Sequence, residues 1–111
     1  MTNPAKPFIG RWRITFMEEW DQDYVDLVTP GFIEFNENET GEFQFGTVQG
    51  FIDHRIQKFG KQIQIEFSWE GSNDSDPGSG RGWAFLEDGK LVGHLFIHMS
   101  DDSAFVAEKL K

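Results

Sequence analysis

The sequence predicts an all-β domain, a meander of about eight short antiparallel strands that closes into a barrel. Apolar and polar residues alternate with a period of two along most of the 111 residues, which is typical of half-buried strands. Turn residues follow these stretches at short intervals, so consecutive strands are expected to pair as antiparallel neighbours. Twelve Phe and four Trp supply a core for one domain over residues 1–111. A two-sheet sandwich is the main alternative.

The first expected strand covers 10–17, where Trp12, Ile14 and Phe16 share one face. The segment over 18–28 breaks the alternation, because its apolar residues recur at helical spacing. A Pro-Gly pair follows this segment and would end a helix. We therefore expect one short helix between the first and second strands, closing one mouth of the barrel.

The next three strands are separated by an Asn- and Glu-rich turn and by a glycine that predicts a kink. In the middle strand, Thr47 and Gln49 have the same phase as two phenylalanines, so both are expected to face the interior. In the strand after it, His54 shares its face with two isoleucines. These strands cover 32–36, 42–49 and 51–59.

The second half of the chain has the clearest alternation and the strongest turn signals. An Asp-Gly pair predicts a tight hairpin, whereas the Gly-, Ser- and Asp-rich stretch over 71–80 is expected to form a loop. Arg81 and Trp83 are expected to point into the barrel. The four expected strands cover 62–70, 81–87, 91–99 and 104–110.

Composition excludes several classes of function. The chain has no cysteine, which excludes disulfides and thiol catalysis and favours a cytoplasmic location. We expect neither a signal peptide nor a membrane span, because no apolar stretch approaches the roughly 20 residues that a spanning helix needs. The formal net charge of −9 repels phosphate groups, so nucleic acids and anionic membranes are not expected partners.

Gly10-Arg11-Trp12 resembles the G-x-W motif that opens lipocalins and related calycin barrels. The resemblance implies a Trp that closes one end of the barrel, packed against an Arg of the last strand, where this chain offers only Lys109. The chain as a whole also resembles a group of small uncharacterised bacterial proteins, which implies no activity. The stretches that carry this second resemblance are 20–27, 43–46, 67–71 and 79–83.

A set of inward polar residues predicts a binding site for a small, partly apolar ligand. Such sites are mostly apolar with a few polar groups, and we assign Thr47, Gln49, His54 and Trp83 to this one. The alternative is a filled barrel, because an interior formed by eight strands leaves little room beside so many aromatic side chains.

An outward apolar patch predicts an interface. The strand over 91–99 is apolar on both faces, and its outward side carries Val92, His94 and Phe96. Val106 of the last strand adds to this side. A strand that is apolar on both faces is usually covered, either by the helix or by another subunit. We expect a homodimer in which these residues are buried.

We expect no enzyme activity, no cofactor and no metal site. None of the common catalytic motifs is present in the sequence. His94 and His98 lie four residues apart on one strand, which separates them by about 13 Å. The loop over 71–80 lacks the Gly and Glu of a calcium-binding loop at the required positions. Two hypotheses remain, a small-ligand carrier and an interaction or structural module with a filled barrel.

Overall fold

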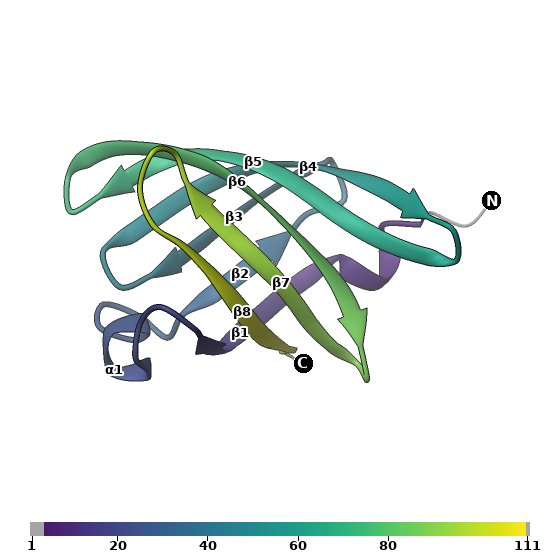
Figure 1. The fold of residues 1–111 in the computed structure, drawn as a ribbon, viewed down its shortest axis with the longest axis horizontal. Coiled ribbons are helices and arrows are strands. Elements are labelled where there is room, and N and C mark those ends of the chain that lie inside the picture. The colour runs from purple at the N-terminus through teal and green to yellow at the C-terminus, as the bar shows by residue number, and fades with distance from the viewer. Residues whose placement is uncertain (1–3, 111) are drawn as a thin grey trace.

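The computed structural model describes residues 4–110 and shows a closed barrel of eight antiparallel strands (Figure 1). Each strand pairs with the next along the chain, and the last pairs back with the first. The expected meander barrel is confirmed, and the sandwich is excluded. The elements are η1 (Lys6–Phe8), β1 (Gly10–Met17), α1 (Gln22–Val25), β2 (Phe32–Phe35), β3 (Thr40–Phe45), β4 (Val48–Phe59), β5 (Gln62–Asn73), β6 (Asp76–Glu87), β7 (Lys90–Ile97) and β8 (Asp102–Lys109).

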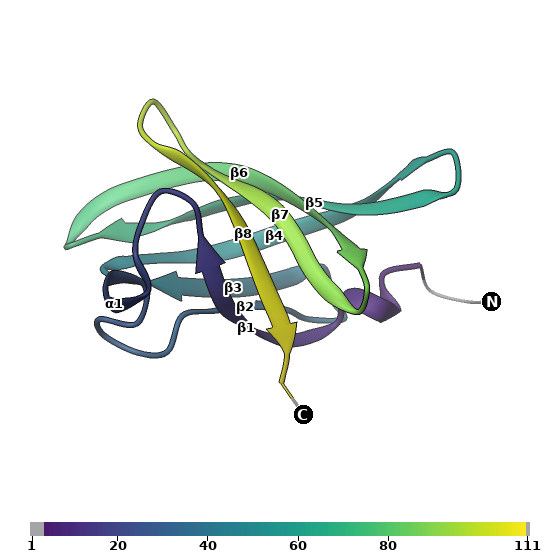
Figure 2. The same cartoon turned by 60° about the horizontal axis from the view of Figure 1, so that its bottom comes forward.

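Two short helices lie at opposite ends of the barrel, α1 at one end and η1 at the other (Figure 2). Of the segment 18–28, where a helix was expected, only α1 is helical. The Asp21 carboxylate caps its first turn by accepting a hydrogen bond from the Tyr24 backbone N–H at 2.9 Å. Leu27 and Val28 are each 62% exposed, so the helical stripe is not buried as a whole. Val25 is fully buried and fixes α1 to the barrel.

Asp26 joins the segment after α1 to strand β1. Its carboxylate accepts from the Arg13 guanidinium at 2.7 Å, from the Gln22 amide at 3.1 Å and from the Gly31 backbone N–H at 2.8 Å. Desolvation by itself would raise the pKa of this carboxyl, but the hydrogen bonds from Arg13, Gly31 and Gln22 and the charge of Arg13 outweigh it. The pKa of Asp26 is therefore lowered from 3.8.

Replacing Asp26 with asparagine is expected to destabilise the fold by about 1 kcal/mol near neutral pH, because charged hydrogen bonds are lost. A lowered folded-state pKa contributes stability above the unfolded-state pKa, and this contribution is lost as the pH falls through the folded-state value. The difference between Asp26→Asn and wild type should therefore shrink below pH 3.8. Urea unfolding across this range measures it, with the exposed Asp23→Asn as control. A difference independent of pH would contradict the assignment.

A bulge in β1 changes which residues face the interior. The pairing with β8 shifts register between Ile14 and Phe16, so that Thr15 is the extra residue. Phe16 is consequently 53% exposed, and Met17 takes the inward position at 3% exposure. The expectation that Phe16 shares the inward face of Trp12 and Ile14 is wrong for this reason.

A tight turn at Gly46 and Thr47 separates β3 from β4, where the sequence had indicated one continuous strand. Gly46 adopts φ +56°, and a Cβ at this position would collide with the ring of Tyr24. The turn shifts the alternation by one residue, so Val48 and His54 face inward while Gln49 faces outward and is exposed. The expected inward orientation of Gln49 is therefore wrong.

The expected loop over 71–80 is a continuation of β5 and β6 as a twisted ribbon. The two strands stay in register as far as the pair Asn73 and Asp76. Asp74 and Ser75 form the turn, both with positive φ (51° and 76°), the conformation of a type I′ hairpin. The prediction of a loop is therefore wrong. The polar residues lie on a two-stranded ribbon that extends past the end of β7 (Figure 1).

Strand β6 carries its small residues inside and its aromatic residues outside. Gly82 and Ala84 are buried, and a Cβ on Gly82 would collide with the ring of Phe67 on β5. Trp83 and Phe85 alternate with them and lie on the outer face. The expected inward orientation of Trp83, and with it that of Arg81, is wrong because the large side chains of β5 already fill the space.

Aromatic and aliphatic side chains fill the barrel interior. Phe43 and Trp69 meet edge to face at 5.0 Å, and Phe43 stacks on Phe45 at 5.8 Å. Together these side chains form one buried core. Its members include Trp12, Ile14, Met17, Val25, Ile33, Phe35, Phe43, Phe45, Val48, Ile52, Ile65, Phe67, Trp69, Leu91, Leu95 and Phe105.

Candidate functional site

The four residues predicted to bind a ligand inside the barrel do not come together. Thr47 lies in the turn after β3, where its hydroxyl is 3.1 Å from the Tyr24 hydroxyl and donates to the Asn73 side chain at 2.9 Å. Gln49 and Trp83 point away from the interior. Only His54 has a buried inward side chain. The interior therefore contains no polar cluster built from this set.

His54 is a satisfied core residue. It is 1% exposed, its Nε2 lies 2.9 Å from the carbonyl oxygen of Asn36, and its ring meets Phe35 edge to face at 5.4 Å. These contacts tie β4 to the turn between β2 and β3.

Replacing His54 with alanine is expected to lower the free energy of unfolding by about 2–4 kcal/mol, because a cavity forms and the Asn36 carbonyl loses its partner. Chemical denaturation measures this loss. The exposed His98 provides a matched control, since His98→Ala should change stability by less than about 0.5 kcal/mol. A His54→Ala variant as stable as His98→Ala would show that the buried contact contributes nothing.

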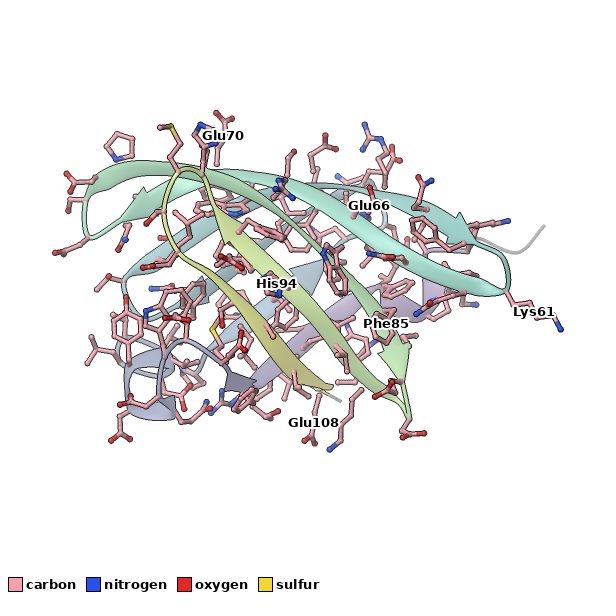
Figure 3. All side chains as sticks on the ribbon, in the orientation of Figure 1. Lys61, Glu66, Glu70, Phe85, His94 and Glu108 are labelled. Atoms are coloured by element: carbon pink, nitrogen blue, oxygen red, sulfur yellow. The ribbon has the colours of Figure 1, made fainter. Side chains whose placement is uncertain are left out.

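The four residues predicted to form an interface, Val92, His94, Phe96 and Val106, lie together on the outer surface of β7 and β8. Outward residues of β6 lie beside them, and Figure 3 labels His94 of β7 and Phe85 of β6. Cross-strand pairs join Trp83 to His94, Phe85 to Val92, and Val92 to Val106. We call this surface the aromatic face. It consists of Trp83, Phe85, Val92, His94, Phe96 and Val106.

Three of the four rings of the aromatic face lie nearly parallel, and the fourth is tilted. Trp83 stacks on Phe85 with an interplanar angle of 11° and on His94 with an angle of 18°. His94 also contacts Phe96 at 4.7 Å between ring centroids. The result is a continuous row of ring contacts on the outside of the sheet. The exposed Phe16, paired with Val106, continues this layer onto β1.

Two of the carboxylates beside the aromatic face have partners. His94 Nε2 lies 2.5 Å from a carboxylate oxygen of Asp102, and Lys90 pairs with Glu108 at 3.7 Å. The pairing limits the charge that an approaching surface would have to desolvate.

The helix does not cover the aromatic face. Trp20, before α1, packs on Phe45 at 4.9 Å, and the Tyr24 hydroxyl bonds to Thr47, so this segment closes the barrel end at the turn between β3 and β4. The other barrel end is closed by η1, whose Phe8 is buried. Of the two covers considered for the apolar strand, the helix is therefore eliminated.

The residues of the G-x-W motif lie at the η1 end. Trp12 is 2% exposed, and its Nε1 donates to the Phe8 carbonyl at 2.9 Å. The ammonium of Lys109 lies 4.8 Å from the centroid of the Trp12 ring and donates to the Ile9 carbonyl at 2.6 Å. A lysine of the last strand thus packs on this Trp. Membership of the calycin group stays a prediction.

Among residues 4–110, no three His, Asp or Glu side chains are placed to share a metal ion. The short helices in this range lack the length and apolar character to cross a bilayer. The sequence pattern indicated the outward residues of β7 and β8 but not Trp83 and Phe85 of the same face. Gly82 and Ala84 are the signal in the sequence that indicates their orientation. Small residues fit opposite large ones inside a small barrel, so the residues that alternate with Gly82 and Ala84 face outward.

Searches against protein-family models, curated proteins and solved structures find no match to this chain.

Proposed function

We propose that this protein is an interaction module that self-associates through its aromatic face. The observation that carries the proposal is a half-buried layer on the outer surface of β6–β8 that neither short helix covers, formed by Trp83, Phe85, Val92, His94, Phe96 and Val106. Contiguous apolar surfaces of this kind mark interaction sites. Aromatic residues are also enriched in interface cores. The cytoplasm, favoured by a sequence without cysteine, is the proposed location.

The closed barrel favours association through a face. Each strand has a neighbour on both sides, so no strand lies at an edge over its whole length. Unpaired stretches remain where β4 runs past β3 and where β6 runs past β7. The interior is occupied by the core, which weakens the case for a ligand carried inside the barrel. We therefore expect a partner to bind to side chains on the outer surface of the sheet.

A second copy of the chain fits the aromatic face better than a charged partner. The apolar side chains of the aromatic face come from three neighbouring strands, and the outer faces of two sheets can pack against each other through such side chains. Two carboxylates beside this surface already have partners, Asp102 in a hydrogen bond with His94 and Glu108 in an ion pair with Lys90. A two-fold contact needs only a self-complementary patch.

Sedimentation equilibrium of the wild-type protein at micromolar concentration tests this proposal. We expect twice the chain mass of 12.8 kDa. Added salt should strengthen the dimer, because it screens the repulsion between two chains of net charge −9. A monomeric mass over this range, at both low and high salt, would overturn self-association.

A further inference from the structure

A surface cleft of about 630 Å³ adjoins one end of the aromatic face. It lies where β5 and β6 run beyond β7, and the turn between β7 and β8 forms its other wall. Its apolar lining comes from Trp69, Phe96, Ile97 and Met99. This volume is in the usual range for small-molecule sites, which are mostly apolar with a few polar groups.

Arg81 supplies the cleft with an uncompensated positive charge. The other three arginines, Arg11, Arg13 and Arg55, each pair with a carboxylate, whereas Arg81 has no such partner among residues 4–110. Its guanidinium lies over the Phe96 ring, 4.1 Å from the centroid. Stacking of this kind fixes the plane of the guanidinium while its N–H groups stay available to a planar carboxylate.

Glu70 supplies the same cleft with an uncompensated negative charge. It lies on β5 beside the turn that joins β7 to β8 (Figure 3). Within the described chain it has neither an ion pair nor a side-chain hydrogen bond, although Arg81 is on the neighbouring strand. Asp102, the other acid in the lining, is engaged by His94. The cleft therefore offers two free charges of opposite sign next to an apolar wall.

We propose that this cleft binds a small zwitterion with an apolar body, in the manner of an apolar α-amino acid. Arg81 receives the carboxylate as a bidentate pair, Glu70 receives the ammonium group, and Phe96 and Met99 contact the apolar part. A ligand without net charge also approaches an acidic protein without repulsion. The cleft is formed within one chain, so the proposal does not depend on self-association.

Isothermal titration calorimetry with leucine, methionine, phenylalanine and tryptophan tests the proposal. We expect at least one of them to bind with a dissociation constant below about 1 mM. For phenylalanine, the deaminated analogue 3-phenylpropionate should bind at least about tenfold more weakly, because it offers nothing to Glu70. If none of the four amino acids binds, or if the analogue binds as tightly as phenylalanine, the assignment of a zwitterion site is wrong.

Arg81→Gln should weaken binding of the preferred amino acid at least about tenfold. Arg11→Gln is the matched control, because Arg11 also stacks on a phenylalanine, Phe32, at 3.7 Å but already has Glu34 as its partner. Equal loss in both variants would contradict a specific role for Arg81. The titration is repeated with the Val106→Glu variant, designed to prevent self-association. If Val106→Glu still binds the amino acid, the cleft is a binding site whether or not the wild-type protein dimerises, so the two proposals can fail separately.

Discussion

Replacing Phe43 with alanine is expected to lower the free energy of unfolding by about 3–5 kcal/mol. Phe43 has no exposed surface and lies in the centre of the aromatic core, against Trp69 and Phe45. The Phe43 ring fits against Gly50 because this residue has no side chain, and a Cβ on Gly50 would lie 2.5 Å from the ring. The surrounding rings belong to separate strands and cannot all collapse into the cavity, so the loss should be near the upper part of this range.

Phe51→Ala is the matched control for this experiment. Phe51 lies on the neighbouring strand, paired with Glu42, but it faces outward and is 62% exposed. Its truncation should change stability by less than about 1 kcal/mol. Urea unfolding followed by tryptophan fluorescence measures both variants. Similar losses for the two phenylalanines would mean that the barrel is not packed around Phe43.

Val106→Glu is expected to raise the dissociation constant of the proposed dimer at least about 100-fold. Val106 lies between Val92 of β7 and Phe16 of β1, so a two-fold contact through the aromatic face would bury two new carboxylates at its centre. An uncompensated buried charge costs several kcal/mol. In the separate chain the same side chain points outward and can reach water, so the fold should survive.

Phe51→Glu provides the control for this second change. It adds the same charge at another outward apolar position, on β4. Sedimentation equilibrium should find this variant still dimeric and Val106→Glu monomeric, with circular dichroism confirming that both are folded. Loss of the dimer in both variants would indicate a general effect of charge and would count against the aromatic face.

The sequence was sufficient for the strand number and order. Alternation marked each strand, and short turns such as Asp88-Gly89 required antiparallel neighbours. It was insufficient for the phase of individual strands, because a single extra residue moves every following side chain to the other face. The bulge at Thr15 and the early turn at Gly46 are such cases.

Hydropathy alone also predicts the wrong orientation for the side chains of β6. The rule that large apolar residues lie inside placed Trp83 in the interior, whereas the ring of Phe67 leaves room only for Gly82 and Ala84. The fit between large side chains on one strand and small ones on the next depends on which strands are neighbours in the barrel. The sequence of one strand by itself does not show this fit. The residues of the candidate face were therefore found on β7 and β8, where both sides of the strand are apolar, and missed on β6.

The pairing of β8 with β1 has a consequence for how the chain folds. All other pairs join neighbours in sequence, and β4 and β5 are each twelve residues long, so their hairpin can form early at small entropic cost. The closing pair joins Trp12 to Lys109, across nearly the whole chain, and is interrupted by a bulge. This seam should form last on the folding pathway and separate first during local opening of the native protein.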